Sequence, residues 1–281
     1  LHMSPMSQRE IIGARCMPFI TDFGVLFFES KRITPIETPK MFERIWDGCM
    51  PGLISGQFVN RNIYYSSYLS TYVERDVREL SGGIDALKFN RFVTAVAART
   101  SQLLNYKAIA DDSDIDMPTA KAWLNILETL GIIFLLHPYS NNVLKRTIKT
   151  PKVYFYDTGL VCYLTKWSSP EVAQSGAMSG ALLENFAVSE IMKNYQNAGL
   201  EPYLYFYRDR DAKEIDIIIE GDGKLCPLEI KKTTTPDKRF TRVFSVIDKS
   251  PLILGTSAIL CMAEHFGAFD RDNLIVPIWM I

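Results

Sequence analysis

Residues 214–231 read EIDIIIEGDGKLCPLEIK, and this stretch decides the fold of the last part of the chain. Two strand-like runs rich in apolar residues flank the turn Gly221-Asp222-Gly223, which is the pattern of a β-hairpin. Successive side chains of a strand point to opposite faces, so one face of the hairpin is predicted to be buried. That face holds Ile215, Ile217, Ile219, Cys226, Leu228 and Ile230. Asp216, Glu229 and Lys231 share the opposite face, where the hairpin brings Asp216 near Glu229.

These three charged side chains predict a site for divalent-cation chemistry on a phosphodiester. Carboxylates hold Mg²⁺, which polarises a phosphate and lowers the pKa of a bound water. A lysine beside the carboxylates, here Lys231, can orient that water or stabilise the charge of the transition state. Asp216 and Glu229 are therefore predicted to be metal ligands.

A helix predicted over residues 182–196 supplies a further carboxylate, Glu184. Its neighbours at helical spacing are apolar, namely Ala187, Val188 and Ile191, whereas Asn185, Ser189 and Lys193 are predicted to face solvent. An unpaired buried carboxylate costs several kcal/mol, so Glu184 is expected to have a partner, as a third or water-mediated metal ligand. The alternative is that Glu229 and Lys231 form an exposed pair while Glu184 caps a helix or makes a local salt bridge.

The composition describes an ordinary globular protein of two or three domains. Of the 281 residues, 47% are apolar and 22% are charged, with a formal net charge of −1. This balance argues against a uniformly basic coat, so any nucleic-acid surface is expected to be a local patch. Five scattered cysteines and three histidines argue against a zinc site and for reduced thiols in a cytoplasmic protein. No apolar run is long enough for a membrane span, and no signal peptide is visible.

The chain is expected to be multi-domain, with α+β segments followed by an α/β domain. Residues 84–166 show three amphipathic helices (87–104, 106–112, 117–130) and two strands (132–138, 152–156), which is the order of a winged helix. The other expected segments are an irregular 1–40, a helical 41–83, a Ser/Gly/Pro-rich break at 167–180 and an α/β domain at 175–281.

The connection between the two predicted strands of the winged helix is basic. It carries Lys145, Arg146, Lys149 and Lys152 and no acidic residue. Four positive charges on a wing can neutralise phosphates, which predicts salt-dependent DNA binding without sequence preference. The opposing signal is a group of aspartates before the third helix, at positions 111, 112, 114 and 116. The alternative is a winged helix that packs against a neighbouring protein domain.

Glu184, Asp216 and Glu229-Ile230-Lys231 resemble the motif of the PD-(D/E)XK nuclease superfamily. Three further stretches are similar to a family of prokaryotic AAA-type ATPases that end in a domain of unknown function on that nuclease-like core. They are YLSTYVERDV (68–77), KRTIKTPKVYFYDTGL (145–160) and GALLENF (180–186). The resemblance covers essentially the whole chain, and it implies a restriction-endonuclease-like α/β fold for residues 175–281.

The same resemblance implies that residues 1–40 are the tail of an ATPase core and residues 41–83 its helical lid. No G-x-x-x-x-G-K-[ST] motif is present, and Leu1-His2-Met3 looks vector-derived. We therefore expect a C-terminal fragment that does not bind ATP on its own. In such a lid Arg75 is a nucleotide-sensing residue, and the alternative is a surface arginine paired with Asp76 or Glu79.

Two functions follow as hypotheses. The first is a Mg²⁺-dependent nuclease coupled to an ATPase, acting on DNA through Asp216, Glu229, Glu184 and Lys231. The second is a catalytically inert nuclease-fold module that binds DNA or a partner protein under ATPase control. Self-assembly through the ATPase part of the parent protein is a further expectation.

Overall fold

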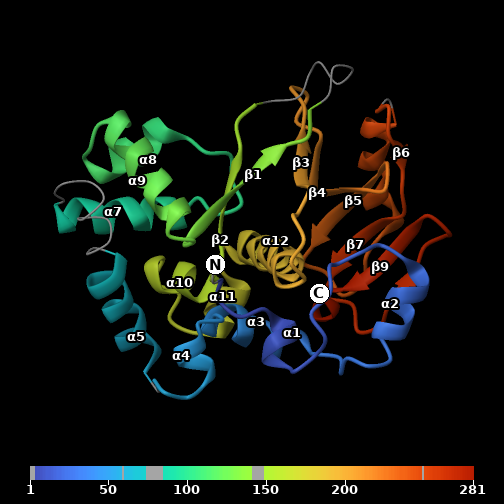
Figure 1. The fold of residues 1–281 in the computed structure, drawn as a ribbon, viewed down its shortest axis with the longest axis horizontal. Helices are drawn as coiled ribbons and strands as arrows, with labels where there is room; N and C mark the ends of the chain where they lie inside the picture. Colours follow the sequence, from blue (N-terminus) through green and yellow to red (C-terminus); the bar gives the residue numbers. More distant parts are fainter. Residues whose placement is uncertain (1–3, 59, 74–84, 141–148, 249) are drawn as a thin grey trace. The chain divides into compact units, whose positions relative to one another are not determined.

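The computed structural model describes residues 4–58, 60–73, 85–140, 149–248 and 250–281, without the side chains of 72 and 73. The chain has a mixed α/β fold, with helices and a mixed sheet (Figure 1). It divides into two compact units, which are described separately below. The first unit comprises residues 1–6, 42–135 and 152–186, and the second comprises 7–41, 136–151 and 187–281.

The first unit is mainly helical. Its helices are α3 (Thr38–Asp47), α4 (Pro51–Ile54), α5 (Arg61–Ser67), the π-helix η1 (Tyr68–Val73), α7 (Ala86–Ala97), α8 (Tyr106–Ser113), α9 (Met117–Thr129), α10 (Thr158–Leu164), α11 (Pro170–Ser175) and the start of α12 (Ser179–Asn197). Most begin at a side chain that accepts a hydrogen bond from an exposed backbone N–H, as Asp85, Asn105 and Asp116 do. Helix α11 lies in the segment predicted to be an irregular break, and Ser169 caps it.

Helices α7, α8 and α9 are followed by strands β1 (Ile133–Pro138) and β2 (Lys152–Phe155), in the order predicted from the sequence. The rings of Phe89 and Phe92 both lie 5.4 Å from that of Trp123, which joins α7 to α9. Helix α7 ends at Ala97, whereas the prediction extended it to residue 104. The backbone turns at Ser101, and the Ser101 amide donates to the carbonyl of Val153 in β2. This strand-like pairing takes the place of the predicted last turns of the helix.

The second unit begins with two short helices, α1 (Gln8–Ile11) and α2 (Phe23–Glu29), so the prediction of irregular structure over 1–40 was wrong there. Ser7 and Asp22 cap these helices through their side-chain oxygens. In α1 the cap is reciprocal, because Glu10 accepts from the backbone and the hydroxyl of Ser7.

The rest of the second unit is built on a mixed sheet (Figure 1). Its strands are β3 (Leu204–Arg208), β4 (Glu214–Gly221), β5 (Lys224–Lys231), β6 (Ile253–Leu254), β7 (Ser257–Cys261), β8 (Gly267–Ala268) and β9 (Asn273–Pro277). They lie in the order β3-β4-β5-β7-β9-β8, with β6 beside β5. The pairs β3–β4, β4–β5 and β8–β9 are antiparallel, and β5–β7 and β7–β9 are parallel. The predicted strand at the C-terminus ends at Pro277, after which η3 (Ile278–Met280) forms a 3₁₀ turn.

The 3₁₀ helix η2 (Lys238–Ile247) covers the face of this sheet that carries the predicted site. Its buried Phe244 and Ile247 pack with Ile218 of β4 and with Ile259 of β7. This face is therefore also apolar along most of its length, and the charged side chains of the site lie in a packed layer. Among the described residues, none of the helices combines the length and the apolar character that crossing a membrane requires.

Candidate functional site

Asp216 and Glu229 occupy neighbouring strands on the same face of the sheet. Strands β4 and β5 pair antiparallel with Ile217 opposite Leu228 and Ile219 opposite Cys226. The paired register ends at Ile217 and Leu228, and Asp216 and Glu229 are the next residues of the two strands on one face of the sheet. The Asp216 carboxylate also reaches across the strands, because its Oδ2 accepts from the backbone N–H of Ile230 at 2.8 Å. That bond fixes the orientation of Asp216 toward the strand that bears Glu229.

Lys231 lies two residues beyond Glu229 and therefore on the same face. Its Nζ donates to Glu229 Oε1 at 2.5 Å. The same ammonium lies 5.7 Å from the centre of the Phe240 ring, a cation–π arrangement that η2 supplies. The sequence pattern did not single out Phe240. The available signal was the strong amphipathic spacing of apolar residues over 238–247.

Asp216 and Glu229 are both nearly buried, since each residue is only 8% exposed. Lys231 is more open, with about a third of its side chain accessible. In the parallel neighbour β7, Glu229 lies beside Ile259 and Lys231 beside Cys261. Low exposure and apolar neighbours strengthen electrostatic interactions, so a cation or a phosphate here would interact strongly with the charges. Within the described residues, no group of three or more His, Cys, Asp or Glu side chains is gathered for a metal.

Glu184 belongs to the first unit, where it has partners that the sequence pattern did not identify. Its Oε1 accepts from Lys152 Nζ at 2.9 Å and from the Tyr154 hydroxyl at 2.7 Å. Lys152 and Tyr154 are two residues apart on β2 and thus share one face of that strand. The Glu184 carboxylate thus has protein partners within the first unit, and its role as a metal ligand stays a prediction. The sequence feature that could have identified these partners is the Lys-x-Tyr spacing in β2, which places Lys152 and Tyr154 on one face of the strand.

The sequence placed Lys152 among the exposed cations of a wing, and the structure corrects this. Lys152 is only 2% exposed, and its charge is directed to Glu184. Burial of the lysine is possible because the carboxylate and the ammonium neutralise each other. Of the other predicted wing cations, Lys149 is exposed. Lys145 and Arg146 lie outside the described residues, as does Arg75.

The prediction for helix α12 was also wrong in one respect. Asn185, Ser189 and Lys193 were expected to face solvent, and the structure buries all three. Within the first unit, Asn185 pairs with both backbone groups of Phe155 and accepts from Thr100. Within the second unit, Glu190 binds the backbone N–H of Gln8 at 2.7 Å and the ammonium of Lys193 at 2.5 Å. Buried polar groups persist when they are hydrogen-bonded, which a one-sided helical pattern does not reveal.

Comparison with known proteins gives two partial family matches. Residues 38–171 match the model of a domain of unknown function, DUF8612, and residues 179–281 match that of a second, DUF4143. No solved structure matches the chain.

Curated relatives are similar over a longer stretch. They include Uncharacterized protein Rv2008c of Mycobacterium tuberculosis and Uncharacterized protein Mb2031c of Mycobacterium bovis. Each is 28% identical over 238 residues, which cover 84% of this chain and 52% of the relative. The chain thus spans about half the length of the curated relatives it matches, and its recognised regions are similar to two domains of unknown function.

Proposed function

We propose that the second unit is a divalent-cation-dependent phosphodiesterase, a nuclease, in which Asp216 and Glu229 hold the metal and Lys231 acts beside it. One observation carries the proposal: two nearly buried carboxylates lie on the same face of adjacent strands, each next to the last paired residue of its strand, with a lysine ammonium 2.5 Å from one of them. Charged side chains are rarely placed in a packed face of a sheet unless they pair or act chemically.

The donor set fits Mg²⁺. This ion prefers carboxylate oxygens and keeps several waters, so one or two carboxylates together with substrate phosphate oxygens can hold it. Asp216 and Glu229 supply two carboxylates on one face, and Asp216 is held in place by the Ile230 amide. A bound Mg²⁺ would supply Lewis acidity to the phosphate and a more acidic water. The proposal rests on Asp216, Glu229 and Lys231, and it does not require Glu184.

Each residue has a defined task in this reaction. Asp216 and Glu229 provide the negative charge and the oxygen donors, and the apolar layer around Ile218 and Ile259 excludes bulk water. Lys231 neutralises Glu229 before substrate arrives and can then turn to a phosphate oxygen, since its ammonium is the accessible charge of the group. The Phe240 ring limits where that ammonium can swing.

For residues 84–166 we propose a winged helix that binds DNA through the basic connection between its two strands. The order α7, α8, α9, β1, β2 and the exposed Lys149 support this role. Lys152 is not included, because its charge is committed to Glu184. Since the matched region covers only 52% of each relative, we further propose that the parent protein adds an ATPase part, as the sequence resemblance implies.

A second function is favoured by a specific observation. Lys231 already neutralises Glu229, and among the described residues no third acidic group joins the pair. This arrangement also suits an inert nuclease fold that binds DNA or a partner protein. The two functions differ in one measurable property, which is metal-dependent cleavage.

The test is cleavage of plasmid and single-stranded DNA with Mg²⁺ or Mn²⁺. Asp216→Asn keeps an oxygen that can accept from Ile230 but removes the charge, so the fold should persist while cleavage falls about 100-fold or more. Lys231→Ala should lower cleavage similarly. Glu220→Gln is the matched control, because Glu220 lies on the same strand and the same face, opposite Leu225. Unchanged cleavage in both Asp216→Asn and Lys231→Ala would refute the enzymatic role.

A further inference from the structure

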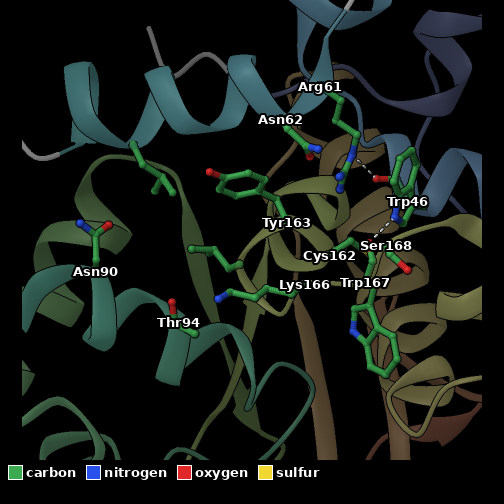
Figure 2. A pocket seen from close by; sticks show the side chains of 12 residues that line it. Trp46, Arg61, Asn62, Asn90, Thr94, Cys162, Tyr163, Lys166, Trp167 and Ser168 are labelled. Atoms are coloured by element: carbon green, nitrogen blue, oxygen red, sulfur yellow. Dashed lines mark hydrogen bonds between the residues drawn. The ribbon is translucent and has the colours of Figure 1, made fainter. Parts of the chain in front are cut away.

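A pocket of about 480 Å³ lies within the first unit (Figure 2). Helices α3, α5, η1, α7 and α10 and the segment after α10 form its walls. Its polar lining includes the cations Arg61 and Lys166 and the amides of Asn62 and Asn90, and none of the twelve described lining residues is acidic. Aromatic rings of Trp46 and Trp167 add flat apolar walls. This volume is in the range of small-molecule sites, and the charge of the lining is positive.

Lys166 has a backbone conformation that its side chain disfavours. Its φ is +61°, in the left-handed region, directly after the last turn of α10. The Trp167 amide donates to the carbonyl of Cys162 at 3.0 Å, which closes the helix end in a motif that normally has glycine at this position. Glycine would be accommodated more easily than lysine. The lysine at this position therefore has a conformational cost, which favours a role for its ammonium group.

The Lys166 ammonium extends into the pocket (Figure 2). Within the described part of the chain it has no hydrogen-bond or ion-pair partner, in contrast to Lys152. Positive charges that line a concave surface attract anions and raise their local concentration.

Arg61 is the second cation, and its position is fixed. Its Nε donates to the Trp46 carbonyl at 2.9 Å and its Nη2 to the Gly159 carbonyl at 2.7 Å. The guanidinium also stacks over the Trp46 ring, 4.0 Å from its centre. These contacts are to neutral groups, so the arginine keeps its full positive charge at the pocket wall.

The π-helix η1 adds an independent feature to the same pocket. It contributes Leu69 to the lining. Helices of this kind are rare and are found frequently at functional sites. Two uncommon backbone conformations, at η1 and at Lys166, thus border one cavity, where strain is often stored for binding.

We propose that this pocket binds a small organic anion, a phosphate monoester or a carboxylate carried on a flat ring. Lys166 receives the anionic group, Arg61 adds a fixed positive potential, and the indole rings contact the flat body. The assignment is independent of the nuclease proposal, since every residue that carries it lies in the first unit.

The test uses matched small molecules and the indole N–H signals of Trp46 and Trp167 in NMR spectra of the full chain. Phenyl phosphate, benzoate and AMP are the anions, and benzamide and adenosine are the neutral counterparts. We expect the anions to shift both signals at millimolar concentration, with affinity that falls as salt is added. Whichever of phenyl phosphate and benzoate binds with the higher affinity identifies the anionic group that the pocket prefers. Equal binding by the neutral counterparts, or no shift with any of the anions, would overturn the proposal.

Substitution of Lys166 separates binding from folding. Lys166→Gly relieves the left-handed strain, so the melting temperature should rise or stay unchanged while anion affinity falls about fivefold. Lys166→Arg should retain binding. Ala212→Gly is the control, because it relieves a comparable φ of +60° in the second unit and should leave anion binding unaltered. Anion affinity that is equal in wild type and Lys166→Gly would contradict the assigned role of Lys166.

Discussion

Asp216 accepts a hydrogen bond from the backbone amide of Ile230, one residue beyond Glu229 on the neighbouring strand. This contact ties the first carboxylate of the site to the strand that carries the second. A carboxylate held in this way has less freedom to lose when a ligand binds. The relationship explains why the charges of the site can persist in a layer otherwise filled by apolar side chains.

The buried pair of Lys152 and Glu184 should contribute strongly to stability. Lys152→Met leaves the Glu184 carboxylate without its positive neighbour, and we expect a loss of about 3 kcal/mol in the free energy of unfolding. Tyr154→Phe removes one hydrogen bond to the same oxygen and should cost about 1 kcal/mol. Urea denaturation measures both. Equal, small effects of the two changes would show that the ion pair is not important for folding.

Gly159 is expected to tolerate no side chain. A Cβ there would clash with the Tyr65 hydroxyl and lie 2.6 Å from the Asp47 carbonyl, in a site where Tyr65 also binds Asp157. Gly159→Ala should therefore destabilise the chain by about 1–3 kcal/mol.

Gly180→Ala is the matched substitution for Gly159→Ala. Gly180 lies in α12 with no neighbour within 4 Å of an added Cβ, and alanine favours helix, so about 0.5 kcal/mol of stabilisation is expected. Thermal unfolding of the two variants should shift in opposite directions. A shift in the same direction would contradict this account of the packing.

Asp270 should give a pH-dependent part of the stability. The hydrogen bond from Lys238 is the main cause that lowers the pKa of Asp270 to about 2, with Asn273 contributing. A carboxyl whose pKa is lower in the folded state stabilises it above the unfolded pKa of about 3.9. That contribution is lost as the pH falls from about 4 to about 2. Wild type should thus be more stable than Asp270→Asn at pH 7, and the difference should vanish near pH 2. Lys238→Met should reproduce part of the effect, and a difference that is independent of pH would refute it.

The sequence predicted much of the sheet because its pattern is local. The two runs around Gly221-Asp222-Gly223 predict a hairpin, and the antiparallel pairing of β4 with β5 from Ile217–Leu228 to Gly221–Lys224 confirms it. The cover of that face by η2 was not predictable in the same way, because Phe244 and Ile247 meet the sheet only through tertiary packing.

Polar residues on α12 and β2 show the limit of single-element patterns. Lys193 and Asn185 were assigned to solvent because polar residues usually are. They are buried because their hydrogen bonds are satisfied: Lys193 donates to Glu190, one turn away on α12, and Asn185 pairs with the backbone of Phe155 on β2. Lys152 is buried for the same reason, through Glu184. Specific hydrogen-bond partners decide such cases, and hydrophobic periodicity does not report them.

The central proposal is a divalent-cation site formed by Asp216 and Glu229, and titration with Mn²⁺ by isothermal calorimetry tests it most directly. Wild type and the Glu220→Gln control should each bind one ion per chain. The double variant Asp216→Asn/Glu229→Gln, checked by circular dichroism to be folded, should bind none, because both anionic donors are gone. Absence of binding in wild type, or unchanged binding in the folded double variant, would contradict the proposal.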